Sequence, residues 1–138
     1  MDQNASIDFG AWDTRKGAEQ GFDLTLKAPD GTRLPGFRIR GYDSSTYQNA
    51  LRAQRRRFMD QATRKRELAP EDVEAETNEL VATLLIAWPD SFALDGKPFP
   101  YSPENALTLV ARFPWAHEQI AGAAAVRENF LPKSSASS

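Results

Sequence analysis

The spacing of apolar and polar positions divides the chain into an extended segment followed by helices. Apolar and polar residues alternate along residues 22–26 and again along 37–40, as in strands with one buried face. Pro29-Asp30-Gly31, which lies between these runs, is a strong turn signal. The pattern predicts an antiparallel β-hairpin over residues 21–42. Its apolar face would be lined by Phe22, Leu24, Leu26, Phe37 and Ile39.

A long helix is predicted to follow the hairpin, over about residues 46–67. Ser45 and Gln48 have the spacing of a capping box at its start. The apolar face of this helix is thin, so its polar face must be solvated or lie against another charged surface. The residues of that apolar face are Tyr47, Leu51, Phe58, Met59 and Ala62.

A second helix is predicted to begin at Pro70 and to form the centre of the core. Leu80, Leu84 and Trp88 fall on one stripe at helical spacing, which continues the helix to Trp88. Two shorter helices follow. Ser102 and Pro103 are a good N-cap and first helical residue for one of them, and Pro114 ends it and opens the other.

These elements predict an α+β protein, an N-terminal β-hairpin followed by a mainly helical body of about four helices. We expect a single domain over residues 21–131, with the hairpin at 21–42 and the helical body at 44–131. Residues 1–20 are polar and punctuated by glycine, which indicates a flexible arm, and the Ser-rich residues 132–138 a disordered tail. Trp12, the one large apolar group of the arm, either folds onto its own chain or anchors a partner.

The sign of the charge changes between the first two predicted helices. The basic run, between residues 51 and 66, comprises Arg52, Arg55, Arg56, Arg57, Arg64, Lys65 and Arg66. The acidic run that follows comprises Glu67, Glu71, Asp72, Glu74, Glu76 and Glu79. One interpretation is a helical hairpin, turning near residues 68–69, whose two runs face each other. The other is a binding surface, because the basic run extends too far from the turn for every arginine to be paired.

Composition limits the partners and the compartment. The 138 residues carry a formal net charge of −2, so nothing global indicates binding to nucleic acid or an anionic membrane. No apolar run approaches the roughly 20 residues that span a bilayer, and the polar N-terminus lacks a signal-peptide core. We therefore expect a cytoplasmic protein, and the absence of cysteine excludes disulfides and permits a reducing compartment.

Candidate chemistry is sparse. His117 is the only histidine, and no set of residues at metal-ligand spacing accompanies it. A nucleophile needs a base and an orienting group, for which the sequence offers no local signature. We therefore expect no enzymatic activity, no cofactor and no metal. The candidate protein-binding residues are Trp12, Arg52, Arg55, Arg56, Phe58 and Met59.

The segment from Trp88 to Trp115 holds most of the large aromatic residues of the C-terminal half. Asp95-Gly96 marks a turn within it, and Pro98 and Pro100 keep the next residues extended. Together with Gly41-Tyr42-Asp43-Ser44 before the long helix, this segment resembles the tail assembly chaperones of long-tailed bacteriophages. The resemblance covers residues 41–131. Its C-terminal part lies in Trp88, Asp95-Gly96-Lys97-Pro98, Tyr101, Glu104-Asn105-Ala106 and Phe130.

The resemblance implies a transient role in the host cytoplasm. Such chaperones bind the tape measure protein, a long and largely helical chain, keep it soluble and assist polymerisation of tail tube protein, and they are absent from the virion. A long chain whose apolar stripes await burial aggregates unless these are covered. The resemblance therefore predicts an apolar groove between helices, with Arg55–Arg57 on its rim.

Two other functions stay open. The chain could be a small helical adaptor or a nucleic-acid-binding regulator that uses the basic helix 51–66, although the adjacent acidic run would repel phosphate. It could also be a structural tail component. The hairpin edge and the long charged helix both permit a homo-oligomer, without specifying one.

Overall fold

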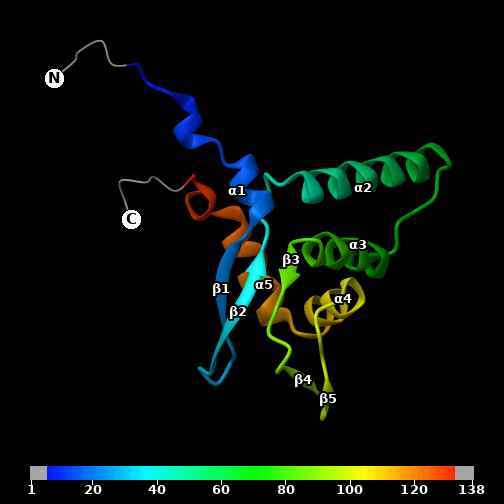
Figure 1. The fold of residues 1–138 in the computed structure, drawn as a ribbon. Coiled ribbons are helices and arrows are strands. Elements are labelled where there is room, and N and C mark those ends of the chain that lie inside the picture. Colours follow the sequence, from blue (N-terminus) through cyan, green and yellow to red (C-terminus); the bar gives the residue numbers. More distant parts are fainter. Residues whose placement is uncertain (1–5, 133–138) are drawn as a thin grey trace.

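The computed structural model describes residues 6–132, in which an antiparallel sheet packs against helices (Figure 1). The mixture of helices and strands agrees with the predicted α+β class. Residues 1–5 of the predicted arm and all but Pro132 of the predicted tail lie outside the described residues.

The predicted hairpin is present as β1 (Phe22–Lys27) and β2 (Arg33–Ile39). The two strands are antiparallel, and Leu24 lies opposite Phe37, so the predicted apolar residues share one face. The loop between the strands, residues 28–32, is shorter than the gap between the two alternating runs of the sequence. It is closed by a 2.8 Å hydrogen bond from the Ala28 N–H to the Thr32 carbonyl, and Gly31 supplies the positive φ of 93° that its turn requires.

The prediction that the second helix continues to Trp88 is wrong. Helix α3 (Pro70–Ala82) ends six residues before that tryptophan, and β3 (Leu85–Ala87) follows as the third strand of the sheet, antiparallel to β2. The Thr83 hydroxyl donates a 2.6 Å hydrogen bond to the Leu80 carbonyl where the helix ends. A short apolar run suits a buried helix and a buried strand equally, and here pairing with β2 decides between them.

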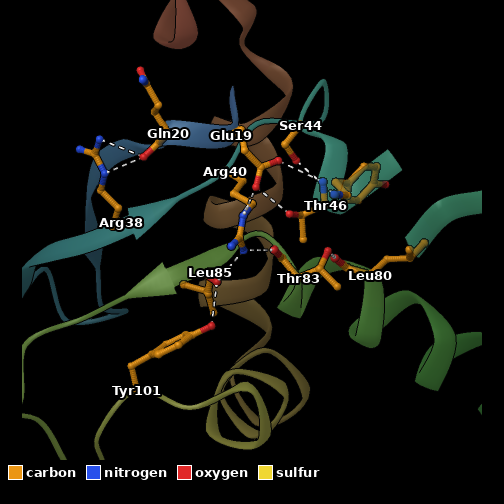
Figure 2. Close-up of polar contacts among 11 residues, drawn as sticks. Glu19, Gln20, Arg38, Arg40, Ser44, Thr46, Leu80, Thr83, Leu85 and Tyr101 are labelled. Carbon is orange, nitrogen blue, oxygen red and sulfur yellow. Dashed lines mark hydrogen bonds and ion pairs between the residues drawn. The ribbon is translucent and has the colours of Figure 1, made fainter. Parts of the chain in front are cut away.

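The long helix is α2 (Ser45–Thr63), which ends four residues before the predicted boundary. Its N-cap is Ser44, one residue earlier than predicted, and the Ser44 hydroxyl accepts a 3.1 Å hydrogen bond from the Tyr47 N–H (Figure 2). The Gln48 amide does not close the predicted capping box. It donates instead to the Tyr42 carbonyl, at 2.7 Å.

The structure also differs from the predicted flexible arm. A 3₁₀ turn η1 (Phe9–Trp12) is followed by helix α1 (Arg15–Gln20), in which Ala18 is fully buried. A Cβ on Gly17 would lie 2.1 Å from the Phe130 carbonyl oxygen, so only glycine permits this approach. The packing of α1 depends on small residues and therefore leaves no apolar pattern in the sequence.

Arg40 joins three elements around α1 (Figure 2). Its guanidinium donates to the Glu19 carboxylate at 3.2 Å, and to the backbone carbonyls of Thr83 at 2.8 Å and Leu85 at 3.3 Å. Glu19 in turn accepts hydrogen bonds from the hydroxyl and the N–H of Thr46, which hold its pKa below the ordinary value together with Arg40. This network ties α1 to β2, to the start of α2 and to the end of α3.

The remaining elements complete the core. They are β4 (Ala93–Leu94), β5 (Lys97–Pro98), α4 (Pro103–Arg112), α5 (Pro114–Ala125) and the 3₁₀ turn η2 (Arg127–Phe130). Ser102 caps α4 and Pro114 opens α5, as predicted. Thus α2 to α5 match the predicted four helices, and α1 is additional.

Helix α5 lies along the outer strand β1. The Gln119 side chain accepts from the Lys27 N–H and donates to the Lys27 carbonyl, both at 2.8 Å. These bonds occupy backbone groups at the edge of the sheet that would otherwise be open to another strand. Pairing through this end of the hairpin edge, one of the routes to self-assembly left open above, is therefore restricted.

Candidate protein-binding site

The candidate site is an open apolar pocket of about 200 Å³. It lies between the hairpin, the β4–β5 segment and the junction of α4 with α5. Its lining residues, all of them apolar or aromatic, are Leu26, Leu34, Phe37, Trp88, Phe92, Ala93, Leu94, Phe99, Leu109, Phe113 and Trp115. Many of them come from the segment between Trp88 and Trp115, so the aromatic-rich stretch of the sequence builds this pocket.

Trp88 is the fixed centre of the pocket. Its side chain is buried, and its indole Nε1–H donates a 2.7 Å hydrogen bond to the Phe99 carbonyl. The ring stacks on Phe99 with centroids 5.2 Å apart and meets Tyr101 edge-on at 5.3 Å. The Tyr101 hydroxyl donates to the Leu85 carbonyl in β3 (Figure 2). These contacts hold the extended residues 99–101 against the end of the sheet.

A turn between β4 and β5 forms one side of the pocket. Asp95 and Gly96 both have positive φ, 52° and 81°, which is the conformation of a tight hairpin turn. The Arg112 guanidinium donates to both Asp95 carboxylate oxygens, at 2.7 and 2.9 Å, and lowers the pKa of that carboxyl. This ion pair attaches the turn to the last residue of α4. The Asp-Gly turn recognised in the sequence thus has a structural role, because it holds one wall of the pocket in position.

The pocket suits an apolar side chain. A dry cavity of about 150 Å³ is large enough for one benzene ring. A pocket of about 200 Å³ with aromatic walls could therefore receive one large apolar side chain of a partner. Its rim residues Leu34, Leu94 and Trp115 are only partly buried, so they are available for contact.

The predicted binding residues of the basic helix lie elsewhere. Arg52, Arg55, Arg56 and Met59 are exposed on α2, and Phe58 is half-buried on its inner side. None of them lines the apolar pocket, nor does Arg57. The structure brings these residues together on one helix, outside this pocket, so a groove with Arg55–Arg57 on its rim stays a prediction.

Helices α2 and α3 form the helical hairpin of the first interpretation, with a connection over residues 64–69. Arg57 donates to both Glu76 carboxylate oxygens, at 2.6 and 3.0 Å, which raises the pKa of the arginine and lowers that of the acid. Gln54 is the buried residue of α2, and the buried Oε1 of Gln61 has no hydrogen-bond partner among residues 6–132.

Trp12 lies apart from both features. It packs edge-on against Phe9, with centroids 5.5 Å apart, and remains 54% exposed beside a shallow hollow that Leu131 also lines. The ring thus contacts its own chain and still presents a large apolar surface. Its role as an anchor for a partner stays a prediction.

The single histidine of the chain lies in a contact between two helices. His117 Nδ1 lies 3.1 Å from the Asn78 Oδ1, a contact between α5 and α3. Within residues 6–132 no group of three or more His, Cys, Asp or Glu side chains is arranged to hold a metal ion. In the same range, none of the helices combines the length and apolarity that crossing a bilayer requires.

Sequence reasoning identified the segment of the pocket but not its shape. Leu34, Phe92 and Leu94 line the pocket but follow no helical or strand pattern, because they lie in turn-rich stretches of the sequence. The available signal was the density of aromatic residues between Trp88 and Trp115 without helical or strand periodicity. Aromatic residues gathered on irregular backbone must converge from several directions, which is how a pocket wall is built.

Comparison with known proteins gives one finding. A family model described as YdaY prophage protein matches residues 42–137, which includes the long helix and the whole aromatic segment. No curated protein and no solved structure matches the chain.

Proposed function

The chain belongs to the YdaY prophage protein family, and we propose that within a prophage it acts as a tail assembly chaperone. In this proposal it binds the tape measure protein in the host cytoplasm, keeps it soluble while tail tube protein polymerises, and is absent from the virion. It acts by binding alone, without a catalytic step or cofactor. The phage origin rests on the family, and the chaperone role on the resemblance and the pocket together.

The observation that carries the proposal is the open apolar pocket. Residues of the resemblance, Trp88 and the Asp95–Gly96 turn, hold its walls in place. A tape measure protein is long and largely helical, so it presents apolar side chains at intervals of three and four residues. One such side chain would enter the pocket, and its neighbours would lie on Leu34, Leu94 and Trp115.

Co-expression with the tape measure protein of the same prophage tests the proposal. The soluble fraction of that protein should rise in the presence of the wild-type chain and fall back with Leu34→Glu or Leu94→Glu, which place a charge at the pocket rim. Met59→Glu is the matched control, because Met59 is 70% exposed on α2 and outside the pocket. Each variant should first be shown to melt cooperatively.

Two results would contradict the proposal. One is a tape measure protein whose solubility is unchanged by the wild-type chain. The other is an equal loss with Met59→Glu and with the pocket variants, since this would place binding on another surface. Presence of the chain in purified virions would favour a structural tail component instead.

A second candidate function is that of a nucleic-acid-binding regulator, which the exposed arginines of α2 favour. Arg55 and Arg56 form no ion pair with any residue of the described range. This function requires a salt-dependent mobility shift with DNA or RNA near physiological ionic strength, lost on Arg55/Arg56/Arg57→Ala. Gene order separates the candidates further, because a chaperone gene should lie between those of the tail tube and the tape measure.

A further inference from the structure

Helices α2 and α3 extend away from the sheet and segregate charge between them (Figure 1). We refer to residues 45–82 as the charged arm. Its first helix carries the basic run and its second the acidic run, although the chain as a whole has a net charge of only −2. The arm is therefore strongly dipolar within a nearly neutral protein.

Pairing inside the arm uses few of these charges. Arg57 and Glu76 pair across the two helices, and Arg64 pairs with Asp60 on α2 at 3.5 Å. The other charged side chains of the arm form no ion pair with any part of residues 6–132. The basic ones are Arg52, Arg55, Arg56, Lys65 and Arg66, and the acidic ones are Glu67, Glu71, Asp72, Glu74 and Glu79.

The unpaired charges of α2 lie on one face. Gln54, Phe58 and Gln61 mark its inner side, since they are buried or half-buried. Arg52, Arg55, Arg56 and Met59 recur at helical spacing on the outer side, where all four are exposed. We call this set the basic face. Met59, at the C-terminal end of this set, is 70% exposed, so the face also offers apolar surface.

The unpaired charges of α3 form a matching set. Glu71, Asp72, Ala75 and Glu79 are all exposed and fall at helical spacing, and we call them the acidic face. They differ from the side of α3 that meets α2, which carries Glu76 and Leu80, both half-buried. Each helix of the arm thus presents a charged face that its partner helix leaves free.

We propose that the charged arm is a self-association surface, on which the basic face of one copy docks on the acidic face of a second copy of this chain. The argument is charge complementarity. A partner of a single sign, such as nucleic acid or an acidic protein, would satisfy one face and be repelled by the other. A second copy carries both faces, so each face can meet side chains of the opposite charge.

The dimensions of the arm suit such a contact. The basic face spans residues 52–59 and the acidic face residues 71–79, roughly 10–12 Å each at 1.5 Å per residue, so several charges can meet at once. Exposed ion pairs are individually weak and are screened by salt, with a Debye length of about 10 Å at 0.1 M and about 3 Å at 1 M. The association should therefore be reversible and strongly dependent on ionic strength.

Sedimentation velocity of the purified chain, free of nucleic acid, tests this surface. At low salt the wild type should form a species larger than a monomer, and raising the salt to about 1 M should weaken association at least tenfold. Arg52/Arg55/Arg56→Glu and Glu71/Asp72/Glu79→Lys should each be monomeric at low salt. Both variants keep Arg57 and Glu76, so the pair that joins the two helices remains.

An equimolar mixture of the two charge-reversed variants is the decisive sample. The acidic α2 of one then faces the basic α3 of the other, so association should return although each variant alone is monomeric. A monomeric wild type at low salt, association that persists at high salt, or a mixture that stays monomeric would each overturn the proposal. Association that requires added nucleic acid would also overturn it.

The experiment is independent of the chaperone proposal. The pocket variants Leu34→Glu and Leu94→Glu lie outside the charged arm, and should associate as the wild type does. The charge-reversed variants leave the pocket intact. Loss of self-association and loss of tape measure binding can therefore be told apart.

Discussion

Two regions of the molecule are held together in different ways. One is the sheet with helices α4 and α5, and the other is the charged arm. The first region buries large apolar side chains completely or almost completely. Among them are Leu26, Ile39, Leu84 and Ile120. In the second, the buried residue of α2 is the polar Gln54, and one ion pair crosses between the helices. Burial of apolar surface supplies most folding free energy, whereas exposed ion pairs supply little.

This difference assigns different roles to the two regions. A preformed pocket needs rigid walls, and it lies where apolar burial is greatest. A salt-sensitive surface needs exposed charges, and the basic and acidic faces of the arm carry them. We expect hydrogen exchange to be slowest in the sheet and α4, and faster in α2, whose opening exposes little apolar surface.

Replacing the central tryptophan should have the largest effect. Trp88→Ala removes a buried ring, its stacking on Phe99 and its hydrogen bond, and should lower the free energy of unfolding by about 3–5 kcal/mol. Phe58→Ala, on the inner side of α2, is the matched change in the arm and should cost much less. Urea denaturation measures both, and equal losses would contradict the contrast between the regions.

A pair of glycine substitutions tests the junction at α1. Gly17→Ala places a Cβ 2.1 Å from the Phe130 carbonyl oxygen, and should destabilise by about 1–3 kcal/mol through backbone displacement. Gly122→Ala on α5 meets nothing within 4 Å, and should stabilise by about 0.5–1 kcal/mol. Thermal melts of the two variants should move in opposite directions. A Gly17→Ala variant that melts at the same temperature as the wild type would mean that α1 is not packed as described.

Acid should weaken the same junction. Asp43 accepts two hydrogen bonds from Arg127, at 2.7 and 3.0 Å, and one from Thr14 at 2.6 Å, and these hold its pKa below the ordinary 3.8. A carboxyl with a depressed pKa binds fewer protons in the folded state. Its contribution is thus complete above pH 3.8 and is lost as the pH falls through the lower folded value.

Urea denaturation at a series of pH values below about 5 checks this contribution. Asp43→Asn should be less stable than the wild type at neutral pH, and the difference should shrink as the pH falls. Arg127→Gln should also make the free energy of unfolding less dependent on pH, because it removes the main cause of the lowered pKa of Asp43. A difference between wild type and Asp43→Asn that stays constant with pH would contradict the assignment.

The smallest effect is expected for the ion pair of the arm. Arg57 is half exposed, so breaking its pair with Glu76 should cost only about 0–1 kcal/mol. A double-mutant cycle of Arg57→Ala and Glu76→Ala isolates the coupling between them. A coupling comparable to the loss in Trp88→Ala would show that electrostatics, and not apolar burial, organises the arm.

Local signals in the sequence predict much of this fold. Alternation specifies the hairpin and its buried face, and Ser102 with Pro103 marks the start of α4. The errors arise where tertiary contacts decide. Residues 84–88 satisfy a helical stripe as well as a strand, and pairing with β2 favours the strand. Helix α1 depends on the close approach of Gly17 to a residue more than 100 positions away.

The site was predictable only in part, for a related reason. The basic stripe of α2 is visible because charges recur at helical spacing. The pocket is not, because Leu34, Phe92 and Trp115 come together from a strand, a turn and a helix start. The sequence therefore drew attention to the arginines, whereas the structure provides an apolar pocket elsewhere.

The three tryptophans allow the most direct test of tape measure binding. Trp88 and Trp115 line the pocket and Trp12 does not, so their indole N–H signals report on different surfaces. Nuclear magnetic resonance spectra of the ¹⁵N-labelled chain, titrated with a helical segment of the tape measure protein, should show the Trp88 and Trp115 signals moving while Trp12 stays in place. A shift of Trp12 alone, or no shift of any indole signal, would contradict the account.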